Sequence, residues 1–186
     1  PYMATIYFET GTCYRQLNKL DKTLEMYHKC LAIRLKVFGD NHLHTAIIYN
    51  SIGFAYQHKK DNKQALFYYF KALNIYKQVD SISERIVRNH INIAQLYCEQ
   101  KDYEQALLFC QKSIALLINY DNSDKYSNPP LKKCLEAYTQ NWLIVSILTQ
   151  KASIFKYLSE QQNEQKVYYL ELAFQTFQLL FKLLIQ

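Results

Sequence analysis

The sequence contains few of the residues that interrupt helices. Of its 186 residues only 3 are glycine and 3 are proline, both far below average usage. Long turns and β-rich topologies need such residues as punctuation, so their scarcity favours helices. Because 49% of the residues are apolar, the chain can still build a continuous core. We therefore expect an all-α protein.

Long runs of one kind of residue are also missing. The 22 basic and 16 acidic residues, with a formal net charge of +6, are scattered along the chain, so no basic stripe predicts a nucleic-acid partner. No apolar stretch reaches the length of a membrane span, and no signal peptide opens the chain. We expect neither a nucleic-acid partner nor a membrane segment.

The five cysteines do not form a disulfide or zinc pattern. Their number is odd and no pair has C-x-x-C spacing, which is typical of reduced, packed thiols in a cytoplasmic protein. Because the chain begins with Pro1 and enters a helical pattern at once, we interpret it as a fragment of a longer protein.

Motifs for catalysis are absent as well. The chain has no glycine-rich phosphate loop, no Gly-x-Ser-x-Gly elbow and no paired carboxylates. His42-x-His44 could ligate a metal, but no cysteine or carboxylate set stands nearby, and solvated loop histidines are the simpler interpretation. We expect no enzyme activity, no catalytic residue, no metal and no cofactor.

A repeated pattern dominates what the sequence does contain. Gly11-x-x-Tyr14 recurs as Gly53-x-x-Tyr56 and as Ala94-x-x-Tyr97, at intervals of 42 and 41 residues. In each copy a small residue and leucine follow at the same distance: Thr23-Leu24, Ala65-Leu66 and Ala106-Leu107. A period of this length is typical of helical solenoids, in which neighbouring units bury one another's apolar faces. Such chains bind partners and rarely catalyse.

Turn signals divide the chain into helix pairs. We expect three pairs within residues 1–120, at about 2–38, 43–79 and 83–120, then a polar connection at 121–130 and a divergent fourth pair within 131–186, with helices at about 131–158 and 165–185 and a turn at 160–164. We predict that Asp21 caps the second helix, that Asp61 and Asp102 lie at the later turns, and that Gly39 ends the first pair with a positive φ.

The landmarks resemble the tetratricopeptide repeat. The fullest match consists of Gly53, Tyr56, Ala65, Tyr69 and Ala72. The resemblance implies a right-handed superhelix of antiparallel helix pairs that binds a protein or peptide, and in this family the first helix of each pair lines the concave face.

Two subfamilies resemble the chain more closely. The stretch 32–42 looks like the long repeats of kinesin light chains. The Asn-Pro-Pro-Leu segment at 128–131 and the segment 170–179 are similar to the N-terminal regions of bacterial CHAT-domain proteins. The latter resemblance implies a bacterial, cytoplasmic protein in which these repeats regulate a C-terminal effector, a caspase-like protease.

The repeat frame assigns candidate binding residues to the concave face. They are Phe8, Thr12, Asn50, Phe54, Gln57, Arg88, Asn92 and Gln95. An asparagine amide can pair with both the N–H and the C=O of an extended peptide, so Asn50 and Asn92 are the strongest candidates. The alternative is that these amides bond their own helix neighbours or water, and that Phe8 and Phe54 pack between helices.

A second hypothesis is architectural. The last predicted helix carries Phe174, Phe177, Leu180, Phe181 and Leu184, which is more apolar than the polar cap that usually ends a solenoid. The chain would then form homo-oligomers through its apolar solenoid ends.

Overall fold

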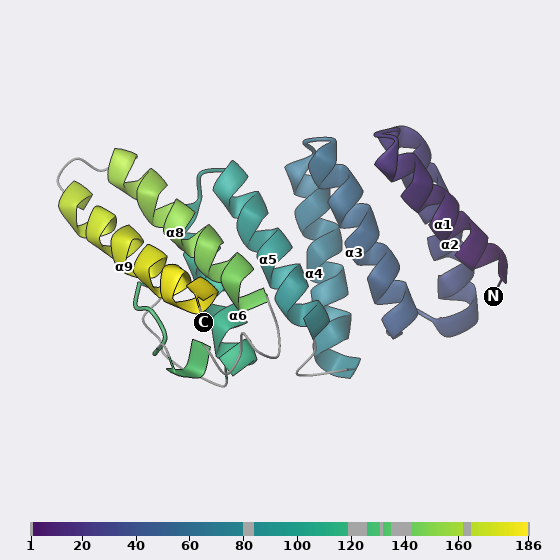
Figure 1. Cartoon of the computed structure of the whole chain (residues 1–186). Coiled ribbons are helices and arrows are strands. Elements are labelled where there is room, and N and C mark those ends of the chain that lie inside the picture. The colour runs from purple at the N-terminus through teal and green to yellow at the C-terminus, as the bar shows by residue number, and fades with distance from the viewer. Residues whose placement is uncertain are drawn as a thin grey trace. The chain divides into compact units, whose positions relative to one another are not determined.

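The chain is built from helices. The computed structural model describes residues 2–79, 84–118, 126–130, 132–134, 143–161 and 165–185, and contains no strand in these ranges (Figure 1). The helices there are α1 (Tyr2–Gln16), α2 (Leu20–Phe38), α3 (Leu43–His58), α4 (Asn62–Val79), α5 (Glu84–Glu99), α6 (Tyr103–Ile118), α8 (Leu143–Gln161) and α9 (Lys166–Ile185). The expected all-α class is confirmed.

The helices fall into two compact units, Pro1–Asn92 and Ile93–Gln186. In the first unit α1 packs against α2, α2 against α3, and α3 against α4. The connections between α1 and α2 and between α3 and α4 are only three residues long, so each pair is an antiparallel hairpin.

Close contact of the paired helices in this unit depends on glycine. A Cβ on Gly11 would lie 2.7 Å from two carbons of the Tyr27 ring, and one on Gly53 would lie 2.8 Å from the Tyr69 ring. Both tyrosines are buried. Glycine is therefore required in the middle of α1 and α3 because the partner helix places a tyrosine ring on its backbone.

The helix starts differ between the pairs. The Oδ1 atoms of Asp61 and Asp102 accept from the backbone N–H groups of Gln64 and Gln105, at 3.1 and 3.2 Å. Each aspartate thus caps its helix. The prediction that Asp21 caps α2 is wrong: the N-cap there is Lys19, which makes no side-chain cap bond.

Asp21 has another role, because α2 begins at Leu20 and places it in the first turn. Its carboxylate pairs with the ammonium group of Lys59 at 2.5 Å, and so links the start of α2 to the end of α3. At the other end of α2, Gly39 has a φ of 80° and its N–H donates to the carbonyl of Leu35 at 3.0 Å, which confirms the expected positive φ.

In the second unit α8 packs against both α6 and α9. Its core includes Phe155 and a fully buried Lys151, whose ammonium group donates to the carbonyl of Ser127. The divergent fourth pair is described only in part. Residues 131 and 135–142, within the expected first helix, lie outside the described residues, as do residues 121–125 of the expected connection and residues 119–120 at the end of the expected third pair. The turn predicted at 160–164 is wrong at its start, because α8 continues to Gln161, and residues 162–164 lie outside the described residues.

Among the described residues, no helix combines the length and the apolar character needed to cross a membrane.

The thiols differ in burial. Cys30, Cys110 and Cys134 are buried and Cys98 is half-buried, but Cys13 is exposed. The expectation of packed cysteines is therefore wrong for Cys13.

Candidate functional site

A cavity of about 310 Å³ lies between α1 and α3 in the first unit. We call it the α1–α3 cavity. It is lined by Phe8, Glu9, Thr12 and Arg15 of α1, Tyr27 of α2, and Asn50, Ser51 and Phe54 of α3. Four of the eight predicted binding residues thus come together here: Phe8, Thr12, Asn50 and Phe54.

Aromatic rings form two walls of this cavity. The ring of Phe8 stacks on that of Tyr27, with 5.6 Å between centroids. On the other side the guanidinium carbon of Arg15 lies 5.2 Å from the centre of the Phe54 ring, a cation–π contact that connects α1 to α3. Both phenylalanines are half-buried, so they contact the fold and face the cavity at once.

The hydroxyl groups of the cavity are held by local bonds. Thr12 Oγ1 donates to the carbonyl of Phe8 at 3.0 Å and lies 3.2 Å from the phenol oxygen of Tyr27. Ser51 Oγ donates to the carbonyl of Ile47 at 3.0 Å. These bonds fix the side chains in place, which favours a preformed cavity.

Asn50 is partly engaged by a residue that the sequence did not single out. Asn89 Nδ2, from the first turns of α5, donates to Asn50 Oδ1 at 3.0 Å. Asn89 is fully buried, and its own Oδ1 has no hydrogen-bond partner among the described residues. The Oδ1 of Asn50 is therefore committed to the fold, and its Nδ2 is the end that can donate to a peptide carbonyl.

The other four predicted residues lie outside the α1–α3 cavity. Gln57 is buried, and its Oε1 accepts from the phenol of Tyr69 at 2.8 Å, a bond within the helix pair. Arg88 is exposed and pairs with Glu84 one turn before it, at 2.5 Å. Asn92 is half-buried at the end of the first unit, whereas Gln95 is exposed in the second.

Asn50 and Asn92 are also not equivalent within the repeat. Asn50 stands three residues before Gly53, but Asn92 stands two residues before Ala94. Neighbouring residues of a helix point about 100° apart, so the two amides belong to different faces of their helices. Only Asn50 lines the described cavity.

The charges of the cavity are of both signs. Glu9 is exposed and Arg15 is half-buried. The guanidinium group of Arg15 can donate to carbonyl or carboxylate groups of a ligand, and the carboxylate of Glu9 can accept from the ligand's N–H groups. Together with two aromatic walls, this set suits a polypeptide segment better than a purely apolar ligand.

A metal site at His42 and His44 finds no support in their surroundings. Their rings lie 5.2 Å apart, and His42 Nδ1 accepts from the backbone N–H of His44 at 3.1 Å. His42 is the N-cap of α3 and stacks on Phe38 at 4.5 Å, so it is not a solvated loop side chain. The described residues contain no group of three or more potential ligands that could hold a metal ion.

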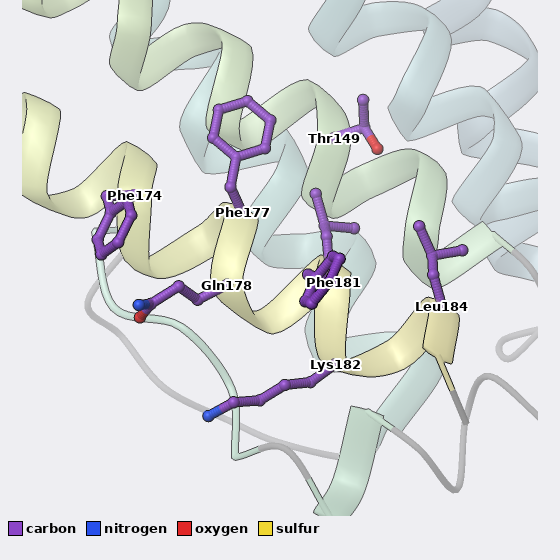
Figure 2. Close-up of a pocket in the computed structure, with 8 residues that line it drawn as sticks. Thr149, Phe174, Phe177, Gln178, Phe181, Lys182 and Leu184 are labelled. Carbon is purple, nitrogen blue, oxygen red and sulfur yellow. The ribbon is translucent and has the colours of Figure 1, made fainter.

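A second, larger cavity lies in the second unit, on α9 and the edge of α8. It has a volume of about 670 Å³. Thr149 of α8 and Phe174, Phe177, Gln178, Leu180, Phe181, Lys182 and Leu184 of α9 line it (Figure 2). Its lining is mostly aromatic and aliphatic, and it contains none of the residues predicted to bind a peptide.

Comparisons with known proteins agree with this architecture. Two sequence models of the tetratricopeptide repeat match residues 2–78 and 91–118. The comparison with curated proteins gives no match.

Among solved structures, the chain is similar to BtubC (BKLC) from P. vanneervenii, with a TM-score of 0.69 and 17% identity over 93% of this chain and 62% of that one. The chain thus spans less than two thirds of that structure's length. It is also similar to the nearly identical TPR-like repeats of a putative kinesin light chain from Podosopora anserina, with a TM-score of 0.57 and 17% identity over 94% and 93% of the two chains. A singly substituted form of those repeats gives a TM-score of 0.58 and 16% identity over 100% and 99%.

At these identities the solved structures establish the fold, a solenoid like that of kinesin-light-chain repeats. The sequence models establish the repeat itself, which generally mediates protein–protein interaction and is typically a non-catalytic scaffold. Through residues 2–78 and 91–118, the chain is a tetratricopeptide-repeat protein.

Proposed function

We propose that the chain is a non-catalytic scaffold that binds an extended peptide or a partner helix in the α1–α3 cavity. One observation carries the proposal: a cavity of about 310 Å³ combines aromatic walls, both signs of charge and an asparagine amide on the first helices of two successive pairs. Cavities with apolar walls and a few placed polar groups are the usual form of a binding site.

The contacts of the lining residues suggest how a peptide would bind. Asn50 Nδ2 would donate to a backbone carbonyl, since its Oδ1 accepts from Asn89. Arg15 would hold an acceptor of the ligand while its guanidinium stays on the Phe54 ring. A side chain of the ligand would enter between Phe8 and Phe54.

A displayed library of random peptides is a direct test. Binders selected on the wild-type chain should lose affinity at least tenfold with Arg15→Ala, because both the ligand contact and the cation–π wall are removed. Arg85→Ala is a matched control, since Arg85 is an exposed arginine of the same unit outside the cavity. Asn50→Ala is less suitable, because it would leave the buried Asn89 amide without its acceptor.

Retention of every selected peptide by Arg15→Ala and by Phe54→Leu would contradict the α1–α3 cavity as the site. Loss of binding in both variants counts only if circular dichroism shows that they melt within a few degrees of the wild type.

The protein that contains these repeats is a further part of the proposal. The Asn-Pro-Pro-Leu and 170–179 segments support a bacterial, cytoplasmic protein in which the repeats sense a partner and regulate a C-terminal CHAT-type protease. The complete reading frame tests this: a His/Cys caspase-like domain would support it, and a kinase or DNA-binding domain would rule it out.

Self-association is the second candidate function. It is favoured by the exposure of Phe174, Phe177, Phe181 and Leu184 on α9 and by the 670 Å³ cavity among them. Mass in solution that rises with concentration would support it, and a monomer at high concentration would count against it.

A further inference from the structure

One face of α9 carries a continuous apolar stripe that is open to solvent. Its members are Val167, Leu170, Phe174, Phe177, Phe181 and Leu184, with exposed fractions of 79, 44, 62, 46, 66 and 62%. We call them the α9 stripe. They follow one another at intervals of three and four residues in strict alternation, the spacing that forms the seam of a coiled coil.

The helix is apolar on two faces. Tyr169, Thr176, Leu179 and Leu183 are buried within the second unit, so the α9 stripe is not needed to hold the helix in place. Figure 2 shows the stripe residues Phe174, Phe177, Phe181 and Leu184 beside the cavity, with Gln178 and Lys182 directed away from Thr149. The stripe therefore has a hollow on the α8 side and a polar rim on the other.

In two other pairs among the described residues, the second helix is covered by a further helix. α2 packs against α3, and α6 packs against α8. The exposure of the α9 stripe leaves the corresponding surface of α9 open, and the natural cover is another helix with an apolar seam.

The charges on the rim indicate which helix fits. Glu171 and Lys182 are both exposed, and residues eleven apart on a helix lie within about 20° of each other around its axis. They therefore lie on the same rim of the stripe. In a parallel twofold pair of α9 helices this rim would lie on opposite sides of the seam in the two copies, so Glu171 and Lys182 would gain no partner from each other. In an antiparallel pair centred on Phe177, Glu171 is six residues before the centre and Lys182 five after it, so the opposite charges would meet within about 1.5 Å of axial offset.

We propose that two copies of this chain associate through the α9 stripe as antiparallel helices, with Phe177 on the twofold axis and Glu171 of each copy beside Lys182 of the other. This rests on the second candidate function above and specifies its interface. The same surface is used by both copies, as closed twofold dimers require.

The exposed surface is sufficient for a modest dimer. An aromatic side chain can bury 150–250 Å², so the exposed parts of the three phenylalanines offer roughly 350 Å² per copy. With the aliphatic members and the rim residues added, the total surface buried by the two copies approaches the ~1,000 Å² that a specific contact requires. We therefore expect a dimer that dissociates on dilution.

Light scattering after size exclusion tests the association. The 22.2 kDa chain should approach twice that mass as concentration rises, and Phe177→Asp should keep it monomeric at every concentration. Phe67→Asp is the matched control, because Phe67 is exposed to a similar extent on α4. A wild-type monomer at millimolar concentration, or a dimer unaffected by Phe177→Asp, would overturn the proposal.

Charge reversal tests the rim. Glu171→Lys alone and Lys182→Glu alone should each raise the dissociation constant severalfold, and the two together in one chain should restore it. Equal effects in the single and double variants would contradict the Glu171–Lys182 pairing.

Disulfide trapping tests the direction and centre of the pair separately from association itself. In a Cys13→Ser background, Phe177→Cys should cross-link under mild oxidation, because the two copies of residue 177 meet at the axis. Leu170→Cys should not, since its copies would lie about 20 Å apart along the helices. Cross-linking at 170 but not at 177, in a chain that dimerises, would overturn the antiparallel geometry while leaving self-association in place. Neither result bears on peptide binding in the α1–α3 cavity.

Discussion

Gly53→Ala should destabilise the protein even though alanine is the better helix former. In a helix interior the substitution would ordinarily gain about 1 kcal/mol. Here the new Cβ would stand 2.8 and 2.9 Å from two carbons of the Tyr69 ring and 3.2 Å from the Ala65 carbonyl oxygen. The ring cannot move aside easily, because Tyr69 is fully buried and its phenol donates to Gln57. Overpacking of this kind costs about 1–3 kcal/mol, so we expect a net loss of about 1 kcal/mol.

The third repeat supplies the control for this prediction. Its small position is Ala94, and sixteen residues later it has Cys110, where the first two repeats have Tyr27 and Tyr69 at the same distance. Alanine is thus paired with a small partner and glycine with a tyrosine. In a Tyr69→Cys background Gly53→Ala should therefore become neutral or stabilising.

Urea titrations of the four chains, followed by circular dichroism, measure the coupling between the two sites. A coupling energy of about 1–2 kcal/mol is expected from the overpacking cost. Stabilisation of the wild-type chain by Gly53→Ala, or an equal effect with tyrosine and with cysteine at position 69, would show that the Tyr69 ring is not overpacked.

Three further outcomes can be measured in the same way. Lys60 has a φ of 64°, which is costly for a residue with a Cβ, so Lys60→Gly should raise the free energy of unfolding by roughly 0.5 kcal/mol after the entropy of glycine is subtracted. Lys19→Asp should add up to about 1 kcal/mol, because Lys19 makes no side-chain cap bond at the start of α2, and an unchanged urea midpoint would contradict this. Burial raises the pKa of Tyr76 to about 12 and that of Cys110 to about 12. The unfolded chain releases these protons near their usual pKa values of 10 and 9. The free energy of unfolding should therefore be constant below about pH 9 and should fall as pH rises toward 12. Alkaline titration monitored by circular dichroism checks this, and constant stability up to pH 12 would refute it.

The repeat architecture could be predicted because its determinants are local and periodic. The scarcity of glycine and proline predicted helices, and the recurrence of Gly11, Gly53 and Ala94 predicted the tetratricopeptide repeat that the sequence models confirm. The two glycines could be attributed to helix packing because an unexplained glycine in a helix interior implies a close neighbour.

Features that depend on contacts between distant residues could not be predicted. Aspartate is a good N-cap, yet Asp21 lies one residue inside α2 and bonds Lys59 instead, a partner 38 positions away. Nor does any local signal show that Asn89 is buried, because asparagine is usually exposed. Its position became evident only once α3 and α5 were seen side by side at Asn50.

The same holds for the candidate site: the part set by the repeat spacing could be predicted, and the part set by side-chain contacts could not. Phe8, Thr12, Asn50 and Phe54 line one cavity because the repeat spacing places α1 and α3 in equivalent positions. Gln57 was assigned to the groove by its place in the helix, but a buried tyrosine partner holds it in the core. Whether a residue of α3 faces the cavity or the core depends on the rotation of the helix about its axis, and the repeat spacing alone does not determine that rotation.

The uneven burial of the cysteines makes the native chain suited to site-selective fluorescence labelling. Burial raises the pKa values of Cys98 and Cys134 to about 11, and Cys30 and Cys110 are shielded in the core. A maleimide dye should therefore attach to Cys13 first, on the helix that supplies half of the α1–α3 cavity. A change in the emission of that dye on addition of a peptide would then measure ligand binding without any engineered residue.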